Sequence, residues 1–165
     1  MQLTRFTDLG LRVVTHLAAA PAADLPNTAS VAEQLGLSYA HTVKVVARLG
    51  ELGVVITRRG RGGGLAITEL GRTATIGWLT RQLEGEGEVV DCDGTKPCPL
   101  RGNCTLRVAL RTAQEAFYSA LDTLTVADLA TRGNTAELPF PVPPRIAPAT
   151  HHEENPCRSR PDPKT

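Results

Sequence analysis

The chain begins with apolar residues at every third or fourth position. Between Thr4 and about Ala20 they repeat with the period of an α-helix that buries one face. This face is predicted to consist of Phe6, Leu9, Val13, Val14 and Leu17. Asp8 and Arg12 lie four residues apart on the polar side, and an aspartate in the first turn interacts favourably with the helix dipole. The chain is therefore predicted to open with an amphipathic helix.

Two further helical segments follow, and a glycine separates them. The first is predicted at residues 28–35 and begins at Asn27 or, through a capping box, at Ser30. Gly36 ends it, because glycine readily adopts the left-handed backbone that terminates a helix. The second extends from residue 38 to about residue 52. Its buried face is predicted to be Thr42, Val45, Val46, Leu49 and Leu52. A helix, a glycine turn and a capped helix are the layout of a helix-turn-helix.

Two β-rich runs come next and enclose a basic, glycine-rich segment. Residues 53–57 and 65–68 are predicted to pair as a hairpin, with residues 58–64 (Arg-Arg-Gly-Arg-Gly-Gly-Gly) at its tip. A phosphate-binding P-loop is disfavoured, because a strand follows the glycines where that motif requires Lys, Ser or Thr and a helix. The hairpin is predicted to be the wing of a winged helix-turn-helix.

Basic residues gather in the third helix and the hairpin tip. Between His41 and Arg61 the sequence holds five Lys or Arg residues and one acid. The start of the second helix of a helix-turn-helix enters the major groove of DNA, and basic side chains meet its phosphates. The predicted DNA-binding residues are Ser38, Tyr39, His41, Lys44, Arg48, Arg58, Arg59 and Arg61. Tyr39, His41 and Lys44 are assigned to base edges or nearby phosphates, and the arginines to the backbone or minor groove.

The C-terminal half is predicted to hold a helix at about 73–83, a solvated acidic linker at 84–93 and a long helix after residue 104. Apolar residues on the long helix alternate between spacings of four and three, as in a coiled coil. They are Leu106, Leu110, Ala113, Phe117, Ala120 and Leu124. The stripe indicates a dimerisation helix, with core packing inside one subunit as the alternative. Thr125 and Asp128 match a capping box that begins a last short helix.

Length and charge limit the organisation of the chain. Its 165 residues suit one compact, mostly α domain with an extension. We expect a winged helix-turn-helix domain at 1–84, a cysteine loop at 85–104, a dimerisation helix with the short helix at 105–133, and a disordered, proline-rich tail at 134–165. The net charge is +1, so any basic surface is local. The sequence contains no signal-peptide-like or membrane-spanning run, so a cytoplasmic protein with reduced thiols is expected.

Three of the four cysteines are evenly spaced in one loop. Five residues separate Cys92 from Cys98 and Cys98 from Cys104, whereas Cys157 lies alone in the tail. Structural zinc usually takes two close pairs, which this spacing does not match. Iron–sulfur clusters accept wider spacing and proline-containing loops, so they are favoured over zinc, with unliganded thiols as the third alternative. An enzyme with a cysteine nucleophile is disfavoured, because no recognisable histidine and acid accompany these cysteines.

The wing tip Gly-Arg-Gly-Gly-Gly, the three cysteines and the long helix behind them resemble the NsrR/IscR family over about residues 1–133. That resemblance implies a homodimeric bacterial transcription regulator, not an enzyme, that binds an operator in double-stranded DNA and carries an iron–sulfur cluster. Members similar to IscR bind a 2Fe–2S cluster with a histidine three residues after the third cysteine. Here Arg107 holds that position, which argues against this subtype.

Members similar to NsrR complete a 4Fe–4S cluster with an aspartate from the first helix of the partner subunit. The opening Leu-Thr-Arg-Phe-Thr-Asp-Leu matches that pattern and places Asp8 at the aspartate. The resemblance therefore implies Cys92, Cys98, Cys104 and the partner's Asp8 as ligands, and a repressor that releases its operator when nitric oxide reacts with the cluster. A regulator with a 2Fe–2S cluster that responds to cluster status or oxidative stress is the alternative.

Overall fold

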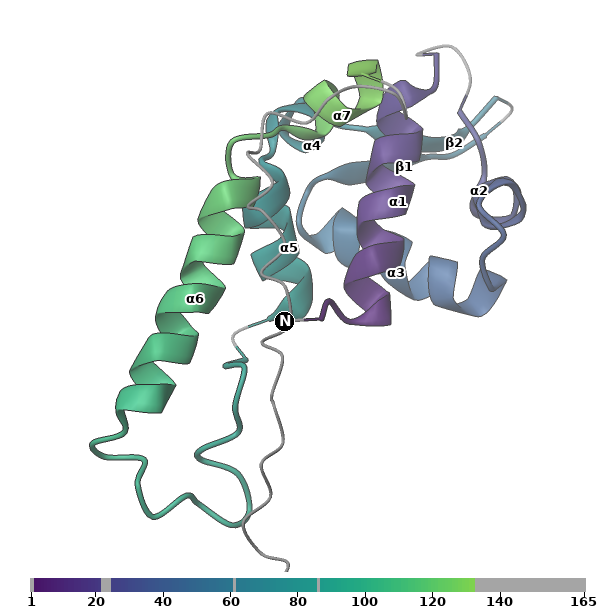
Figure 1. Cartoon of the computed structure of the whole chain (residues 1–165). Coiled ribbons are helices and arrows are strands. Elements are labelled where there is room, and N and C mark those ends of the chain that lie inside the picture. Colours follow the sequence, from purple (N-terminus) through teal and green to yellow (C-terminus); the bar gives the residue numbers. More distant parts are fainter. Residues whose placement is uncertain (1, 22–24, 61, 86, 133–165) are drawn as a thin grey trace, which may run out of the picture.

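The computed structural model describes residues 2–21, 25–60, 62–85 and 87–132. Figure 1 shows a helical body with a small hairpin at one side and a long helix at the other. In chain order the elements are α1 (Arg5–Ala19), α2 (Thr28–Gln34), α3 (Tyr39–Glu51), β1 (Val55–Arg58), β2 (Gly64–Ile67), α4 (Glu69–Thr73), α5 (Ile76–Glu84), α6 (Thr105–Leu121) and α7 (Val126–Arg132). The mostly α winged-helix class is as predicted. The tail at 134–165, with Cys157, lies outside the described residues.

Short polar side chains set where the helices begin. Asn27 Oδ1 accepts a hydrogen bond from the amide of Ser30 at 2.9 Å, so Asn27 caps α2 and the alternative start at Ser30 is wrong. Thr125 and Asp128 form the predicted capping box: the amide of Asp128 donates to Thr125 Oγ1 at 3.1 Å, and the amide of Thr125 donates to Asp128 Oδ2 at 2.9 Å. Ser38 has the extended backbone of a cap, but its side chain makes no capping bond within the described residues.

The helix-turn-helix and its wing are present. Gly36, with φ of 63°, turns the chain from α2 into α3. β1 and β2 pair antiparallel, with Val55 opposite Ile67 and Arg58 opposite Gly64. The amide of Leu65 donates to the carbonyl of Pro26 at 2.8 Å, which attaches the base of the hairpin to the segment before α2. The wing is therefore anchored at its base.

The segment predicted as one helix at 73–83 contains parts of two. α4 ends at Thr73 and α5 begins at Ile76, because Ala74 has left the helical conformation with ψ of 135°. Thr68 and Thr75 cap the two helices, and Thr75 also pairs with Thr125 in an isolated β-bridge. α4 has only five residues, which is too short for an apolar period to reveal it.

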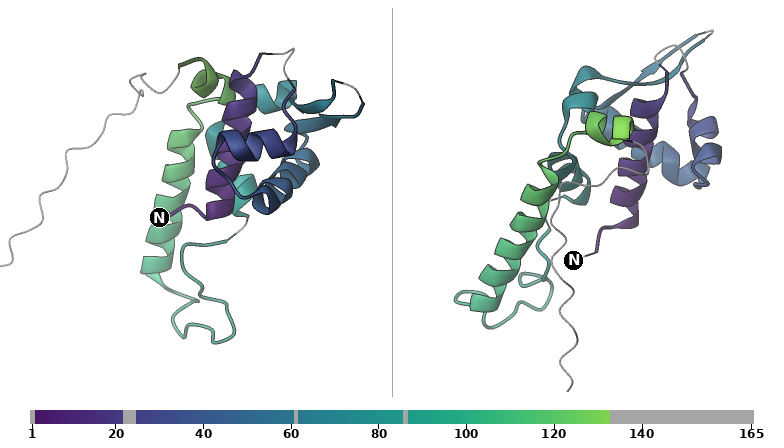
Figure 2. Two further views of the ribbon diagram at one scale, coloured as in Figure 1. Left: turned by 90° about the vertical axis from the view of Figure 1, so that its right-hand side faces the viewer. Right: turned by 45° about the horizontal axis from the view of Figure 1, so that its top comes forward.

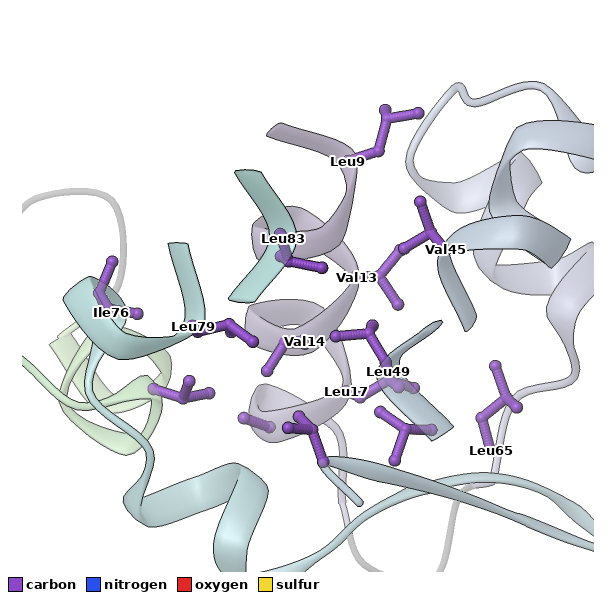
Figure 3. Packing of buried hydrophobic residues seen from close by; sticks show 14 of the residues in the cluster. Leu9, Val13, Val14, Leu17, Val45, Leu49, Leu65, Ile76, Leu79 and Leu83 are labelled. Atoms are coloured by element: carbon purple, nitrogen blue, oxygen red, sulfur yellow. The ribbon is translucent and has the colours of Figure 1, made fainter. Parts of the chain in front are cut away.

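One aliphatic core joins the helix-turn-helix to the segments that follow it. α1 lies at its centre and packs against α3, α5 and α7, and Figure 3 shows its side chains pointing between these elements. The fully buried residues of the core include Val13, Val14, Val31, Val45, Leu49, Val54, Leu79 and Val126. Four of the five predicted apolar positions of the first helix are buried, and Phe6 packs at the edge of the core.

The long helix α6 extends away from this body (Figures 1 and 2). It packs along α5, where Tyr118 is buried and Arg81 pairs with Glu115 at 2.5 Å and with Asp122 at 2.7 Å. The stripe was predicted to run to Leu124, but α6 ends at Leu121 and Leu124 belongs to the core. α7 then returns to pack on α1 and α4. Among the described residues, no helix is both long and apolar enough to cross a bilayer.

Candidate DNA-binding surface and cysteine loop

The N-terminal half of α3 combines a buried face with a polar, exposed one. Thr42 and Val45 are fully buried and fix the helix on the core. The four predicted DNA-binding residues of this half are all exposed: Ser38, Tyr39, His41 and Lys44. Ser38 precedes the helix and the other three residues are spread over the solvent side of its first two turns. This arrangement presents hydroxyl, imidazole and ammonium groups to a partner.

Arg48 differs from these four residues. Its guanidinium donates to Glu51 Oε2 at 3.1 Å and to the backbone carbonyl of Gln82 at 3.3 Å, and the side chain is 40% exposed. Arg48 therefore links the end of α3 to the end of α5 and does not lie with the exposed group. Its predicted DNA contact stays a prediction.

The wing presents its arginines on a tight tip. Arg58 and Arg59 are exposed, and Arg61 lies outside the described residues. Gly60 and Gly62 have φ of 98° and 78°, which disfavours any other residue there. A Cβ on Gly63 would lie 2.3 Å from the carbonyl oxygen of Arg58. These glycines therefore allow the sharp turn that places the two arginines at the end of the hairpin.

The three cysteines of the loop are free and half-buried. The amide of Cys98 donates to the carbonyl of Cys92 at 3.0 Å, and Cys104 Sγ caps α6 by accepting from the amide of Arg107 at 3.4 Å. Burial raises the pKa of the Cys92 thiol, the Arg107 guanidinium opposes this rise, and the Cys98 and Cys104 sulfurs add to it. The Cys98 and Cys104 sulfurs therefore contribute to the electrostatic environment of the Cys92 thiol.

Arginines of α6 hold the loop in place. Arg107 donates to both carboxylate oxygens of Glu88, at 2.6 and 3.1 Å, and to Asp93 Oδ2 at 2.7 Å. Arg111 donates to Glu88 as well. The hydrogen bond from Arg107, followed by that from Arg111, lowers the pKa of Glu88 to about 2. The acidic run was predicted to be an ordinary solvated linker; for Glu88 and Asp93 that is wrong, because they anchor the loop.

The sequence pattern did not predict that Glu88 anchors the cysteine loop to α6. A signal for it was present, because Arg107 and Arg111 are one helical turn apart and follow a run of acids. Complementary charge, however, does not indicate which acid is bound. Arg107 stands at the position of the histidine ligand in the 2Fe–2S subtype, and here its guanidinium donates hydrogen bonds to the carboxylates of Glu88 and Asp93.

The donor set fits an iron–sulfur cluster better than a single ion. Three reduced thiols occupy one loop, and thiolates are the usual ligands of such clusters. Within the described residues of this one chain, no three His, Cys, Asp or Glu side chains converge on one metal-sized position. Asp8 is not among the loop residues; its Oδ1 accepts from Arg12 Nε at 2.9 Å. Among the described residues, Asp8 is thus paired with Arg12 and not with the cysteine loop, and the predicted fourth ligand stays a prediction.

The fold and exposed surface define a winged helix-turn-helix transcription regulator. Solved structures agree on the fold: T. potens IscR aligns with a TM-score of 0.64 at 21% identity over 84% of this chain and 94% of its own. The oxidised form of Staphylococcus aureus CymR aligns with a TM-score of 0.59 at 25% identity over 82% of this chain and 100% of its own.

The family follows from sequence. The model of the Rrf2 family, described as an iron-dependent transcriptional regulator, matches residues 3–132, and the chain belongs to this family. The chain is similar to the HTH-type transcriptional repressor NsrR of Streptomyces coelicolor, with 61% identity over 130 residues that cover 78% of this chain and 88% of that protein. The regulator NsrR of Bacillus subtilis is 39% identical over 131 residues, 78% of this chain and 90% of its own. The predicted resemblance is confirmed, and these relatives are regulators, not enzymes.

Proposed function

We propose that the chain is a dimeric transcriptional repressor whose operator binding depends on a 4Fe–4S cluster and ends on exposure to nitric oxide. The observation that carries the proposal is the set of three free, half-buried thiols on the loop that connects α5 to α6, in a chain that also contains a winged helix. The 61% identity to a repressor named NsrR supports the same function.

The proposed ligands are Cys92, Cys98 and Cys104 of one subunit and Asp8 of the partner subunit. A carboxylate is a harder and weaker iron ligand than a thiolate. The bound cluster would supply iron sites that react with nitric oxide, the most accessible being the one held by the carboxylate. The role of this chain is to hold the thiols half-buried and to present Asp8 on the exposed side of α1, where Arg12 is its partner in the single subunit.

Exposed aliphatic residues near the start of α6 support dimerisation. Leu106, the first residue of the stripe, is 63% exposed, and Val108, which lies outside the stripe on another face of the helix, is 65% exposed. The alternative, that the stripe packs inside one subunit, accounts for the half-buried Leu110 and Phe117 but not for the exposure of Leu106. A second copy of α6 would remove these side chains from water, and burial of apolar surface favours such association.

Polar contacts offer a route from the loop to the recognition helix. Glu88 is bound to α6 through Arg107 and Arg111, and α6 is bound to α5 through Arg81. Arg48 then joins α5 to α3 through the carbonyl of Gln82. A displaced loop would thereby move α3 relative to its counterpart in the partner. Since half-sites lie about 34 Å apart, a shift of a few ångströms is enough to break the match.

The fourth ligand is tested by Asp8→Ala, with Glu69→Ala as the control. Both acids lie in the first turn of a helix, so both changes remove a favourable dipole interaction. Only Asp8→Ala is expected to change the visible spectrum of the anaerobically purified protein and its response to nitric oxide. If the two variants retain the same spectrum and response, Asp8 is not a ligand. An iron and sulfide count matching 2Fe–2S would instead favour the alternative redox or cluster-status sensor.

A further inference from the structure

We propose that Tyr39 and Val43 form an apolar reading surface that recognises thymine methyl groups in the major groove of the operator. This inference rests on the proposed function, because it assumes that α3 enters DNA. It goes beyond that function by naming the chemical feature of the bases that α3 reads.

The two side chains are exposed although they are apolar. Tyr39 is 59% exposed and Val43 is 41% exposed, and they lie four residues apart on α3. Side chains at that spacing are neighbours on one helix face. Among the other large aliphatic residues of the helix, Val45 and Leu49 are fully buried and Val46 is half-buried. Tyr39 and Val43 therefore have no packing role that explains an apolar patch on this face.

The surroundings of the patch match DNA. Lys44 and His41 are exposed beside it, and the sequence from Ser38 to Gly50 contains no acid. Figures 1 and 2 place α3 and α6 on opposite sides of α1 and α5, so the surface proposed for dimerisation does not cover the patch. A face that is apolar and cationic at once, at the start of a recognition helix, is complementary to a groove lined by phosphates.

The apolar group available in that groove is specific. Among the four bases of the major groove, thymine alone presents a methyl group, at C5, and aliphatic or aromatic side chains contact it. Val43 has no hydrogen-bonding atom, so any contribution it makes to sequence preference comes from apolar contact. Tyr39 adds a ring and a hydroxyl group, which could also reach a phosphate. Val43 is therefore the sharper probe of the two.

The sequence pattern did not single out Val43. It lies between Thr42 and Lys44, and its type predicts burial as readily as that of Val45. Only the orientation of α3 on the core shows that Val43 faces outward while Val45 faces inward.

The test uses the anaerobically purified full-length chain and a duplex that it selects from a random 30-base-pair library. Each thymine is then replaced singly by deoxyuridine, which removes the methyl group and keeps the hydrogen-bonding groups. At one or more positions of each half-site, the affinity of the wild-type protein is expected to fall about fourfold. This is the change in binding constant expected when one buried group of methylene size is removed from an apolar contact. Val43→Ala should bind the thymine and uracil duplexes nearly equally. Leu70→Ala, which changes another exposed apolar residue outside α3, should keep the wild-type sensitivity.

The outcomes separate the two proposals. If wild-type protein binds thymine and uracil duplexes equally at every position, methyl recognition is wrong while DNA binding stands. If Val43→Ala keeps the full sensitivity of the wild type, Val43 is not part of the reading surface and the proposal fails in this form. If no duplex is selected at all, the proposed function fails and methyl recognition fails with it.

Discussion

The winged helix and the cysteine loop are stabilised by different interactions. In the winged helix, aliphatic side chains such as Val13, Val45 and Leu49 are fully removed from water. In the loop, the fixed points are the carboxylates of Glu88 and Asp93 and the arginines of α6, and Leu100 is 69% exposed. Burial of apolar surface stabilises a fold in proportion to the area removed from water, whereas ion pairs that are partly open to solvent, as those of Asp93 and Arg111 are, contribute little and respond to salt and pH. This difference is consistent with the proposed switch, in which the loop would change while the winged helix stays folded.

The largest effect is expected from a cavity in the winged helix. Leu49→Ala should lower the free energy of unfolding by about 2–5 kcal/mol, because the Leu49 side chain extends from α3 into the core and is fully buried there. Leu100→Ala in the loop should change it by less than about 0.5 kcal/mol. Urea denaturation followed by circular dichroism measures both. Equal losses in the two variants would contradict the contrast between the regions.

A smaller effect is expected from removing a charge on the exposed side of α3. Lys44→Ala should weaken operator binding and make the dependence of log K on log salt less steep by about 1.8. Each lost phosphate contact accounts for about 0.9 of this change, and a dimer loses one contact in each subunit. Lys96→Ala removes an exposed lysine from the loop and should leave the slope unchanged. Fluorescence anisotropy at several salt concentrations gives the slopes. An unaltered slope for Lys44→Ala would remove Lys44 from the contacts.

The smallest and most local effect concerns pH. Because the folded-state pKa of Glu88 is lowered to about 2 from its ordinary 4.5, its ion pair with Arg107 is complete above pH 4.5 and is lost as pH falls toward 2. Carbon NMR of the Glu88 carboxyl should show this low titration point. In Arg107→Met the titration should move upward but stay below the ordinary value, because Arg111 remains. Titration of wild-type Glu88 near 4.5 would show that the anchor is absent.

The sequence predicted those parts of the fold that local patterns encode. The apolar period of α1, the glycine stop at Gly36 and the Thr125–Asp128 capping box are all local, and each is confirmed. The pattern missed α4 because five residues are too few to show an apolar period. Ser30 was a wrong alternative because Asn27, three residues earlier, is an equally suitable capping residue and accepts the bond from the Ser30 amide.

The site was only partly accessible from sequence. The spacing of Cys92, Cys98 and Cys104 marked them as candidate ligands, and the helix period predicted the exposed face of α3. The bond from Arg48 to Gln82 and the bonds from Glu88 to the arginines of α6 join residues more than fifteen positions apart, so no local pattern reveals them. The fourth ligand is harder still, because its proposed position depends on a second subunit.

The most direct test of the central claim is to purify the full-length chain without oxygen, count iron and sulfide, and follow operator binding as nitric oxide is added. A dimeric 4Fe–4S repressor should be coloured, contain the iron and sulfide of such a cluster, and lose both its colour and its operator as nitric oxide is added. A colourless, iron-free protein that binds the operator with the same affinity before and after nitric oxide would contradict it.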